Sequence, residues 1–149
     1  MSLDRLLHAQ VERLTSLTQL LEQEQQQLTQ GSVDGEALTQ LAQQKQSLLD
    51  DIERAERLRR DVQKRLGYVD GLEGARQAAD DADCASSWTA LLSKSEQTAR
   101  LNALTGEMLA LRMTHNQNML DYIRQIAEKT LYKPDGRNSA QSGRLNTSA

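Results

Sequence analysis

Side chains able to do catalytic or metal chemistry are few and scattered in this sequence of 149 residues. It contains two histidines, His8 and His115, and one cysteine, Cys84. Helical zinc and di-iron sites need several ligands one turn apart, and neither histidine has a Cys or a second His within one turn. Phosphate-binding glycine loops and nucleophile motifs are absent from the sequence. We therefore expect neither an enzyme nor a bound metal or cofactor.

Three further features invite a functional interpretation. The acidic residues Asp80, Asp81 and Asp83 precede Cys84 and would raise the pKa of its thiol rather than activate the thiol. The acidic segment 67–85 lacks the spacing and the glycine of a calcium loop, which favours a role in solubility and helix N-terminal charge. Three methionines share one predicted helix: Met108, Met113 and Met119. Such a stripe is typical of surfaces that accept several partner helices, and equally of an ordinary core.

The composition indicates that long helices carry these side chains. There are 24 Leu but only 7 Val plus Ile, no Phe and one Pro, whereas sheet cores are rich in β-branched and aromatic residues. Seventeen Gln and a mean hydropathy of -0.67 predict helices with solvated faces and a leucine seam rather than a deep pocket. We predict an all-α fold, in which an antiparallel helical hairpin and a long third helix form a coiled-coil-like bundle.

The first two predicted helices form the hairpin. A seven-residue leucine repeat predicts a helix over about 3–29, with leucines at Leu7, Leu14, Leu21 and Leu28. Gly31 is placed for a left-handed C-cap, and Ser32 or Asp34 for the N-cap of the next helix. An alternating three-four spacing of apolar residues predicts that second helix over about 36–66. The short connection predicts antiparallel packing.

Lys45 and Arg59 interrupt the apolar seam of the second predicted helix. Either their aliphatic stems pack while the charged heads extend into solvent, or the charges fix the helix register or contact a partner. The basic residues in the second half of this helix lie one turn from acidic residues, which predicts a salt-bridged face. With a net charge of -3, we expect no nucleic-acid partner.

The third predicted helix is the longest and covers about 87–131. The preceding residues 67–86 form a predicted linker with one short helical stretch over 72–79, and Ser86 or Ser87 is the expected N-cap. At 1.5 Å per residue the helix exceeds its neighbours by roughly 20 Å. Its last part therefore has nothing to pack on, which makes it the place for a partner. Gly106 marks a bend, a close backbone approach or a small-residue packing site.

The residues after the third helix, 132–149, are rich in Ser, Asn and Gly. We predict a disordered tail there and a single helical domain over 1–131. Large apolar residues never occur more than two in a row, and the first residues do not form a signal peptide. A lone cysteine agrees with a reducing compartment. We expect a cytoplasmic protein that is not inserted in a membrane.

Several segments, in their order and spacing, resemble the FlgN family of bacterial flagellar export chaperones. They are residues 24–28, 34–38 and 45–49, Arg59 and Arg60, Trp88, residues 101–106, and the junction with the tail at residues 131–137. The resemblance covers nearly the whole chain. It departs from the family at Thr105, where a second Asn is common, and at Lys133, where a Gly is common.

This resemblance implies a cytosolic chaperone that binds hook-filament junction proteins, which are hook-associated subunits. It would prevent their premature assembly and deliver them to the export gate membrane protein, with the export ATPase complex as a further partner. The family binds the C-terminal segment of its cargo through its own C-terminal region, which corresponds here to Leu111, Met119, Tyr122, Ile123 and Ile126. The tail tyrosine associated with docking to the export gate corresponds to Tyr132.

An alternative function belongs to a different class of protein. The leucine repeat of the first helix also suits a structural homo-oligomeric coiled-coil protein without cargo. Such a scaffold predicts a stable rod-like homo-oligomer in the absence of any partner. The sequence alone leaves the oligomeric state open.

Overall fold

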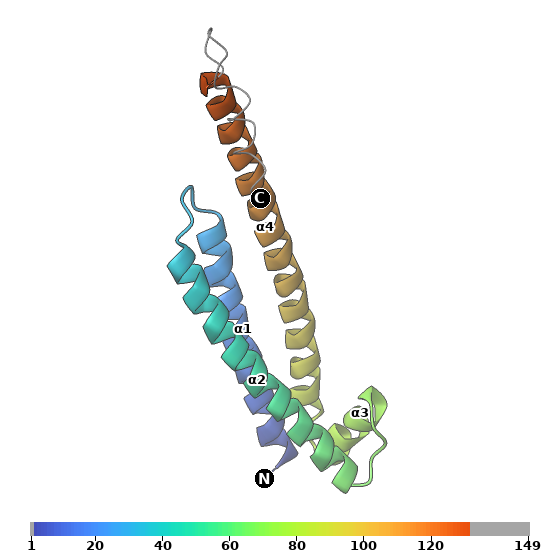
Figure 1. The fold of residues 1–149 in the computed structure, drawn as a ribbon. Coiled ribbons are helices and arrows are strands. Elements are labelled where there is room, and N and C mark those ends of the chain that lie inside the picture. Colours follow the sequence, from blue (N-terminus) through green and yellow to red (C-terminus); the bar gives the residue numbers. More distant parts are fainter. Residues whose placement is uncertain (1, 132–149) are drawn as a thin grey trace. The chain divides into compact units, whose positions relative to one another are not determined.

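The computed structural model describes residues 2–131, which contain four helices and no strand. They are α1 (Leu3–Leu28), α2 (Gly35–Arg65), α3 (Leu72–Asp81) and α4 (Ala85–Leu131) (Figure 1). The all-α prediction is confirmed. The chain divides into two units, residues 1–107 and 108–149, and α4 contributes to both; the single domain over 1–131 stays a prediction. The predicted disordered tail, 132–149, lies outside the described residues.

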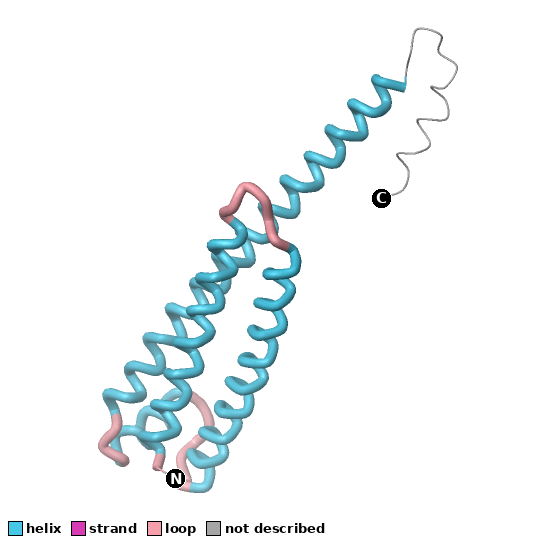
Figure 2. Tube along the Cα trace, turned by 90° about the vertical axis from the view of Figure 1, so that its left-hand side faces the viewer, coloured by secondary structure: helices cyan, strands magenta, loops and turns pink. Residues whose placement is uncertain are grey.

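Helices α1 and α2 form the predicted antiparallel hairpin (Figures 1 and 2). The carboxylate of Asp34 caps α2, because its Oδ1 accepts the N–H groups of Glu36 and Ala37 at 3.1 Å. The prediction for Gly31 is wrong, since its backbone is not left-handed. Helix α1 instead ends at Thr29, a right-handed C-cap whose backbone N–H donates to the Gln25 carbonyl.

Helix α3 lies between α2 and α4, where the chain changes direction. It confirms the short helical stretch predicted in the linker. Gly67 and Gly71 adopt φ values of 88° and 106°, which side chains rarely tolerate. The buried Gln63 fixes the corner, because its amide donates to the carbonyls of Val69 at 2.6 Å and Gly71 at 3.2 Å. The linker is therefore an ordered part of the first unit.

The first part of α4 runs parallel to α1 within the first unit. The hydroxyl of Ser87 donates to Asp4 Oδ1 at 2.6 Å, and the Gln25 amide donates to Thr105 Oγ1 at 3.0 Å. The predicted N-cap at Ser86 or Ser87 is wrong, because α4 already begins at Ala85. A buried core joins α1, α3 and the start of α4, and consists of Leu3, Leu7, Ala75, Ala78, Ala79, Cys84, Trp88 and Leu91.

Gly106 lies within α4, which is helical on both sides of it. A Cβ added there would meet nothing within 4 Å. The interpretations of Gly106 as a close backbone approach or a small-residue packing site are therefore wrong.

Gly74 lies at the crowded point of the corner and gives a first testable prediction. A Cβ there would lie 1.8 Å from the Val69 carbonyl oxygen and 2.9 Å from Gln63 Nε2. We expect Gly74→Ala to lower the free energy of unfolding by about 1–3 kcal/mol, because backbone must move. Gly106→Ala should raise it by about 0.5–1 kcal/mol, because alanine favours a helix and finds open space. Urea unfolding followed by circular dichroism measures both free energies. Equal changes for the two variants would contradict the clash between a Cβ at position 74 and the Val69 carbonyl.

Candidate functional site

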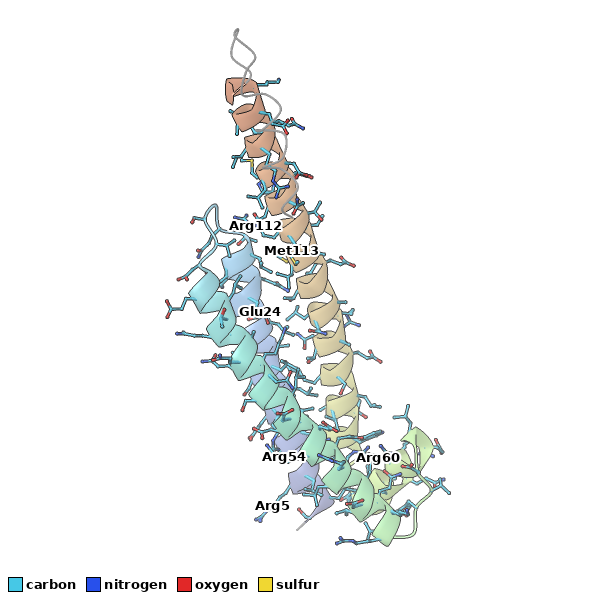
Figure 3. The ribbon with its side chains drawn as sticks, viewed as in Figure 1. Arg5, Glu24, Arg54, Arg60, Arg112 and Met113 are labelled. Carbon is cyan, nitrogen blue, oxygen red and sulfur yellow. The ribbon has the colours of Figure 1, made fainter. Side chains whose placement is uncertain are left out.

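Large apolar side chains are exposed along α4 in the second unit, and we call this set the α4 apolar surface. Its exposed fractions run from 41% to 71%. Figure 3 labels Met113 among the side chains of this helix. A soluble protein rarely exposes so many apolar groups together unless they serve an interaction. The surface consists of Leu109, Leu111, Met113, Met119, Leu120, Tyr122, Ile123 and Ile126.

All five residues predicted to bind cargo lie on the α4 apolar surface, from Leu111 at 71% exposed to Ile126 at 46%. Their role in binding stays a prediction. Tyr132, the predicted docking residue for the export gate, lies outside the described residues. Of the two interpretations of the methionine stripe, an ordinary core is wrong for Met113 and Met119, which are more than half exposed.

The cargo-site prediction missed three members of this surface, namely Leu109, Met113 and Leu120. Their signal was present in the sequence, because they share a three-four spacing with Ile123. That spacing is offset from the one through Met108, Leu111, Met119 and Tyr122, so a search for a single apolar row overlooks it.

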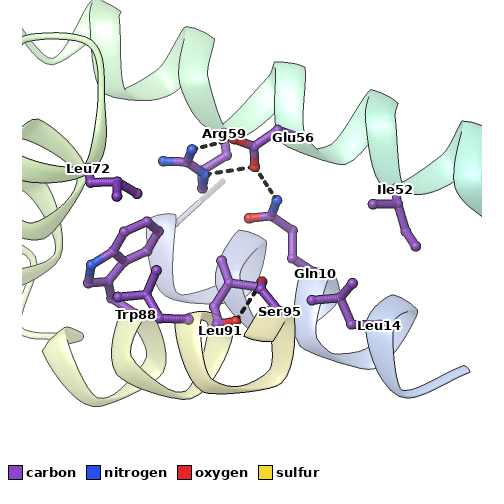
Figure 4. Close-up of a pocket in the computed structure, with 10 residues that line it drawn as sticks. Gln10, Leu14, Ile52, Glu56, Arg59, Leu72, Trp88, Leu91 and Ser95 are labelled. Carbon is purple, nitrogen blue, oxygen red and sulfur yellow. Dashed lines mark hydrogen bonds and ion pairs between the residues drawn. The ribbon is translucent and has the colours of Figure 1, made fainter. Parts of the chain in front are cut away.

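A chain of polar contacts in the first unit joins α1, α2 and the corner, and Figure 4 shows its members Gln10, Glu56 and Arg59. Gln10 donates to Glu56 Oε2 at 2.8 Å, and Arg59 donates to both oxygens of the same carboxylate at 2.6 and 3.2 Å. Arg59 also donates to Gln63 Oε1 at 2.9 Å, and its guanidinium lies over the Trp88 ring, 5.2 Å from the centroid. The buried charge of Arg59 therefore has a partner in Glu56, whose own side chain is 42% exposed, as burial requires.

The interpretation of Lys45 and Arg59 as solvent-extended heads is wrong. Arg59 is 7% exposed and is held by the polar chain and Trp88. The Lys45 ammonium lies 2.9 Å from the buried carboxylate of Glu24 on α1. Both side chains join elements of the fold, which agrees with the alternative that charge fixes the helix register.

A cavity of about 310 Å³ lies beside the polar chain in the first unit. Its wall is mainly apolar, and Figure 4 shows Trp88, Leu91, Leu14 and Ile52 around it. The Glu56 carboxylate at its edge is already engaged by Arg59 and Gln10. The cavity therefore has an apolar wall, and the carboxylate at its edge already has its partners within the protein.

Among the groups of the first unit with shifted pKa values are the Cys84 thiol and the Glu56 carboxylate. The pKa of the Cys84 thiol is raised, first by burial and then by Asp4 and Asp83, so the thiol is held in its unreactive form. The predicted direction is confirmed, but burial outweighs the acidic neighbours. Burial alone would raise the pKa of Glu56, yet hydrogen bonds from Arg59 and Gln10 lower it below 4.5.

The lowered pKa of Glu56 predicts acid sensitivity. The pKa of Glu56 is lower in the folded than in the unfolded protein, so its ionised carboxylate stabilises the fold at pH values above the pKa that it has in the unfolded state. This stabilisation is lost as the pH falls through the pKa that it has in the folded state. We expect the stability advantage of the wild type over Glu56→Gln to shrink between about pH 5 and pH 3. Urea unfolding of both proteins across this range measures it. A constant difference would contradict the assignment.

Residues 2–131 contain no group of three or more His, Cys, Asp and Glu side chains arranged to hold a metal ion. Among the helices of this same part of the chain, none combines the length and the apolar character needed to cross a bilayer.

The leucine repeat of α1 packs against other helices of the same chain. Leu7, Leu21 and Leu28 are 1%, 0% and 6% exposed, and Leu14 packs against the core. This seam is therefore already covered within the folded chain, at Leu7 by α3 and the start of α4. This removes the surface on which the alternative of a homo-oligomeric scaffold depended.

Comparison with known proteins places the chain in a family. The family model described as "FlgN protein" matches residues 1–140. The flagella synthesis protein FlgN of Salmonella typhimurium is 31% identical over 126 residues, which cover 85% of this chain and 82% of the relative. The proteins of the same name from Escherichia coli and Proteus mirabilis are 29% and 28% identical, over 85% and 87% of this chain and 82% and 85% of their own lengths. No solved structure matches the chain. By the extent of the family match and the identity to these relatives, this chain belongs to the FlgN family.

Proposed function

We propose that this protein acts in flagellum synthesis as a cytoplasmic chaperone of type III protein export. It binds the C-terminal segments of hook-filament junction proteins, prevents their premature assembly and delivers them to the export gate. Membership of the FlgN family, whose relatives are named flagella synthesis proteins, supports the flagellar role. The export ATPase complex is a further partner to be tested.

The observation that carries this proposal is the α4 apolar surface. Eight large apolar side chains are exposed within residues 109–126, and such a surface suits an amphipathic helix of a partner. Export substrates that are held unfolded can form such a helix when they bind. Ordering the segment costs several kcal/mol, which keeps the affinity moderate and permits release at the gate.

The test is a calorimetric titration of the full chain with the C-terminal segment of a hook-filament junction protein. A filament-subunit segment of equal length is the control. We expect a Kd in the micromolar range or tighter for the first segment only. Equal binding of both segments, or no binding of either, would refute the proposed function.

Tyr132 allows the two steps of the proposed function to be separated. We expect Tyr132→Ala to leave the Kd for the cargo segment within about twofold, or under about 0.5 kcal/mol, because the residue lies beyond the α4 apolar surface. Binding to the cytosolic domain of the export gate should fall by tenfold or more. Titration with each partner measures both values, with Tyr132→Phe as the conservative control. Equal loss of both would contradict a separate docking residue.

A further inference from the structure

The α4 apolar surface is wider than one partner helix can cover. At about 100° per residue, the side chains from Leu111 round to Met113 span roughly 200° of the helix circumference. A helix that packs on a single neighbour needs an apolar stripe of about 100°. Two neighbours are therefore needed to cover the surface.

The surface resolves into two rows of apolar side chains. The first, which we call the tyrosine row, consists of Leu111, Met119, Tyr122 and Ile126. The second, which we call the leucine row, consists of Leu109, Met113, Leu120 and Ile123. Each row keeps a spacing of three, four or seven to eight residues, typical of one packing seam. Their mean directions differ by roughly 120° around the helix.

The leucine row continues the spacing of the residues that α4 buries in the first unit. Trp88, Leu91, Thr98 and Thr105 are each at most 6% exposed, and they precede Leu109 at helical intervals of three, four or seven residues. In the first unit this face is covered by the chain's own helices. The tyrosine row follows a second face, on which Leu104 is 46% exposed.

Charge distinguishes the possible occupants of the two rows. Arg112 lies between the rows and Lys129 at the edge of the tyrosine row. Arg124 lies at the edge of the leucine row, where it pairs with Asp121 at 3.3 Å, and Glu128 lies on the opposite face of the helix. A second copy of this helix would bring the same positive charges to the interface. A partner whose apolar stripes have acidic borders would complement them.

We propose that residues 108–129 bind two amphipathic helical segments of one cargo protein, one along each row, with acidic side chains bordering their apolar stripes. Helix α4 is then the central helix of a three-helix arrangement. This inference rests on the proposed function and deepens it, because it specifies the form in which the cargo is bound. Coupled folding of two segments gives the complex a larger apolar contact than one helix supplies.

The test compares three double variants of the full chain in titrations with the junction-protein segment. Met119→Gln with Tyr122→Gln changes the tyrosine row, and Leu120→Gln with Ile123→Gln changes the leucine row. Thr114→Gln with Gln125→Asn changes the polar face as the matched control. Glutamine is a good helix former, so the two row variants retain the helix, and circular dichroism verifies that all three variants do. We expect each row variant to raise the Kd at least tenfold, and the control to change it less than twofold.

Photo-crosslinkers placed at Met119 and at Leu120 provide a second readout. They should mark two separate tracts of the same cargo segment. An unchanged Kd for the leucine-row variant, or crosslinks to one tract only, would mean a single bound helix and overturn the inference while the chaperone function stands. A self-association of the free chain that the leucine-row variant abolishes would assign that row to a second copy and also overturn it. Absence of cargo binding by the wild type refutes the proposed function, and the inference with it.

Discussion

Replacing Trp88 with alanine is expected to lower the free energy of unfolding by about 3–5 kcal/mol, the usual cost of removing a buried tryptophan. Its side chain is 6% exposed and belongs to the core that joins α1, α3 and α4. The substitution also removes the ring beneath the Arg59 guanidinium, and such a contact contributes about 0.5–2 kcal/mol. A cavity then remains beside a buried cation.

Two variants on the same side of the molecule control this experiment. Trp88→Phe keeps an aromatic face under Arg59 and should cost clearly less. Leu92→Ala removes a leucine of the same helix that is 37% exposed, and should cost about 1 kcal/mol or less. Urea unfolding followed by circular dichroism measures all three variants. Fluorescence is unsuitable, because Trp88 is the single Trp of the chain and two of the variants remove it. A cost for Trp88→Ala equal to that for Leu92→Ala would contradict its place in the core.

The helices and the hairpin could be predicted because their determinants are local. The leucine repeat sets the buried face of α1, and the carboxylate of Asp34 begins α2. The start of α4 could not be predicted in the same way. The Ser87 hydroxyl, a plausible cap by local pattern, donates to Asp4, 83 residues away in the sequence. A contact between distant residues therefore engages the side chain that looked like a local cap.

The charged residues and the candidate site also divide into features set by the local sequence and features set by contacts between distant residues. Nothing near Arg59 in the sequence indicates that its head is buried, since this depends on the distant Trp88 ring. The exposure of Leu111, Met119 and Tyr122 could be expected, because α4 is longer than its neighbours. Of the leucine row, Ile123 was predicted but Leu109, Met113 and Leu120 were missed. The spacing of this row continues that of the buried face, so the sequence alone does not separate a covered stretch of the helix from an exposed one.

Lys45→Met is expected to lower the free energy of unfolding by about 3 kcal/mol, because it leaves the charge of Glu24 without a partner. The Glu24 side chain is 9% exposed, and its Oε1 accepts no hydrogen bond among the described residues. The Lys45 ammonium at 2.9 Å is what balances this carboxylate. The pair also crosses from α2 to α1, so it opposes a shift of one helix along the other.

The double variant Glu24→Met with Lys45→Met separates these two effects. Replacing a buried ion pair by apolar side chains of similar volume is often neutral or stabilising, so we expect a stability within about 1 kcal/mol of the wild type. If the pair fixes the register, the double variant should retain its helix content but lose the sharp set of NMR signals from the hairpin. Restored stability together with an unchanged spectrum would show that leucine packing alone sets the register. A double variant as unstable as Lys45→Met would show that the cost is lost packing of the lysine stem, and not an uncompensated charge.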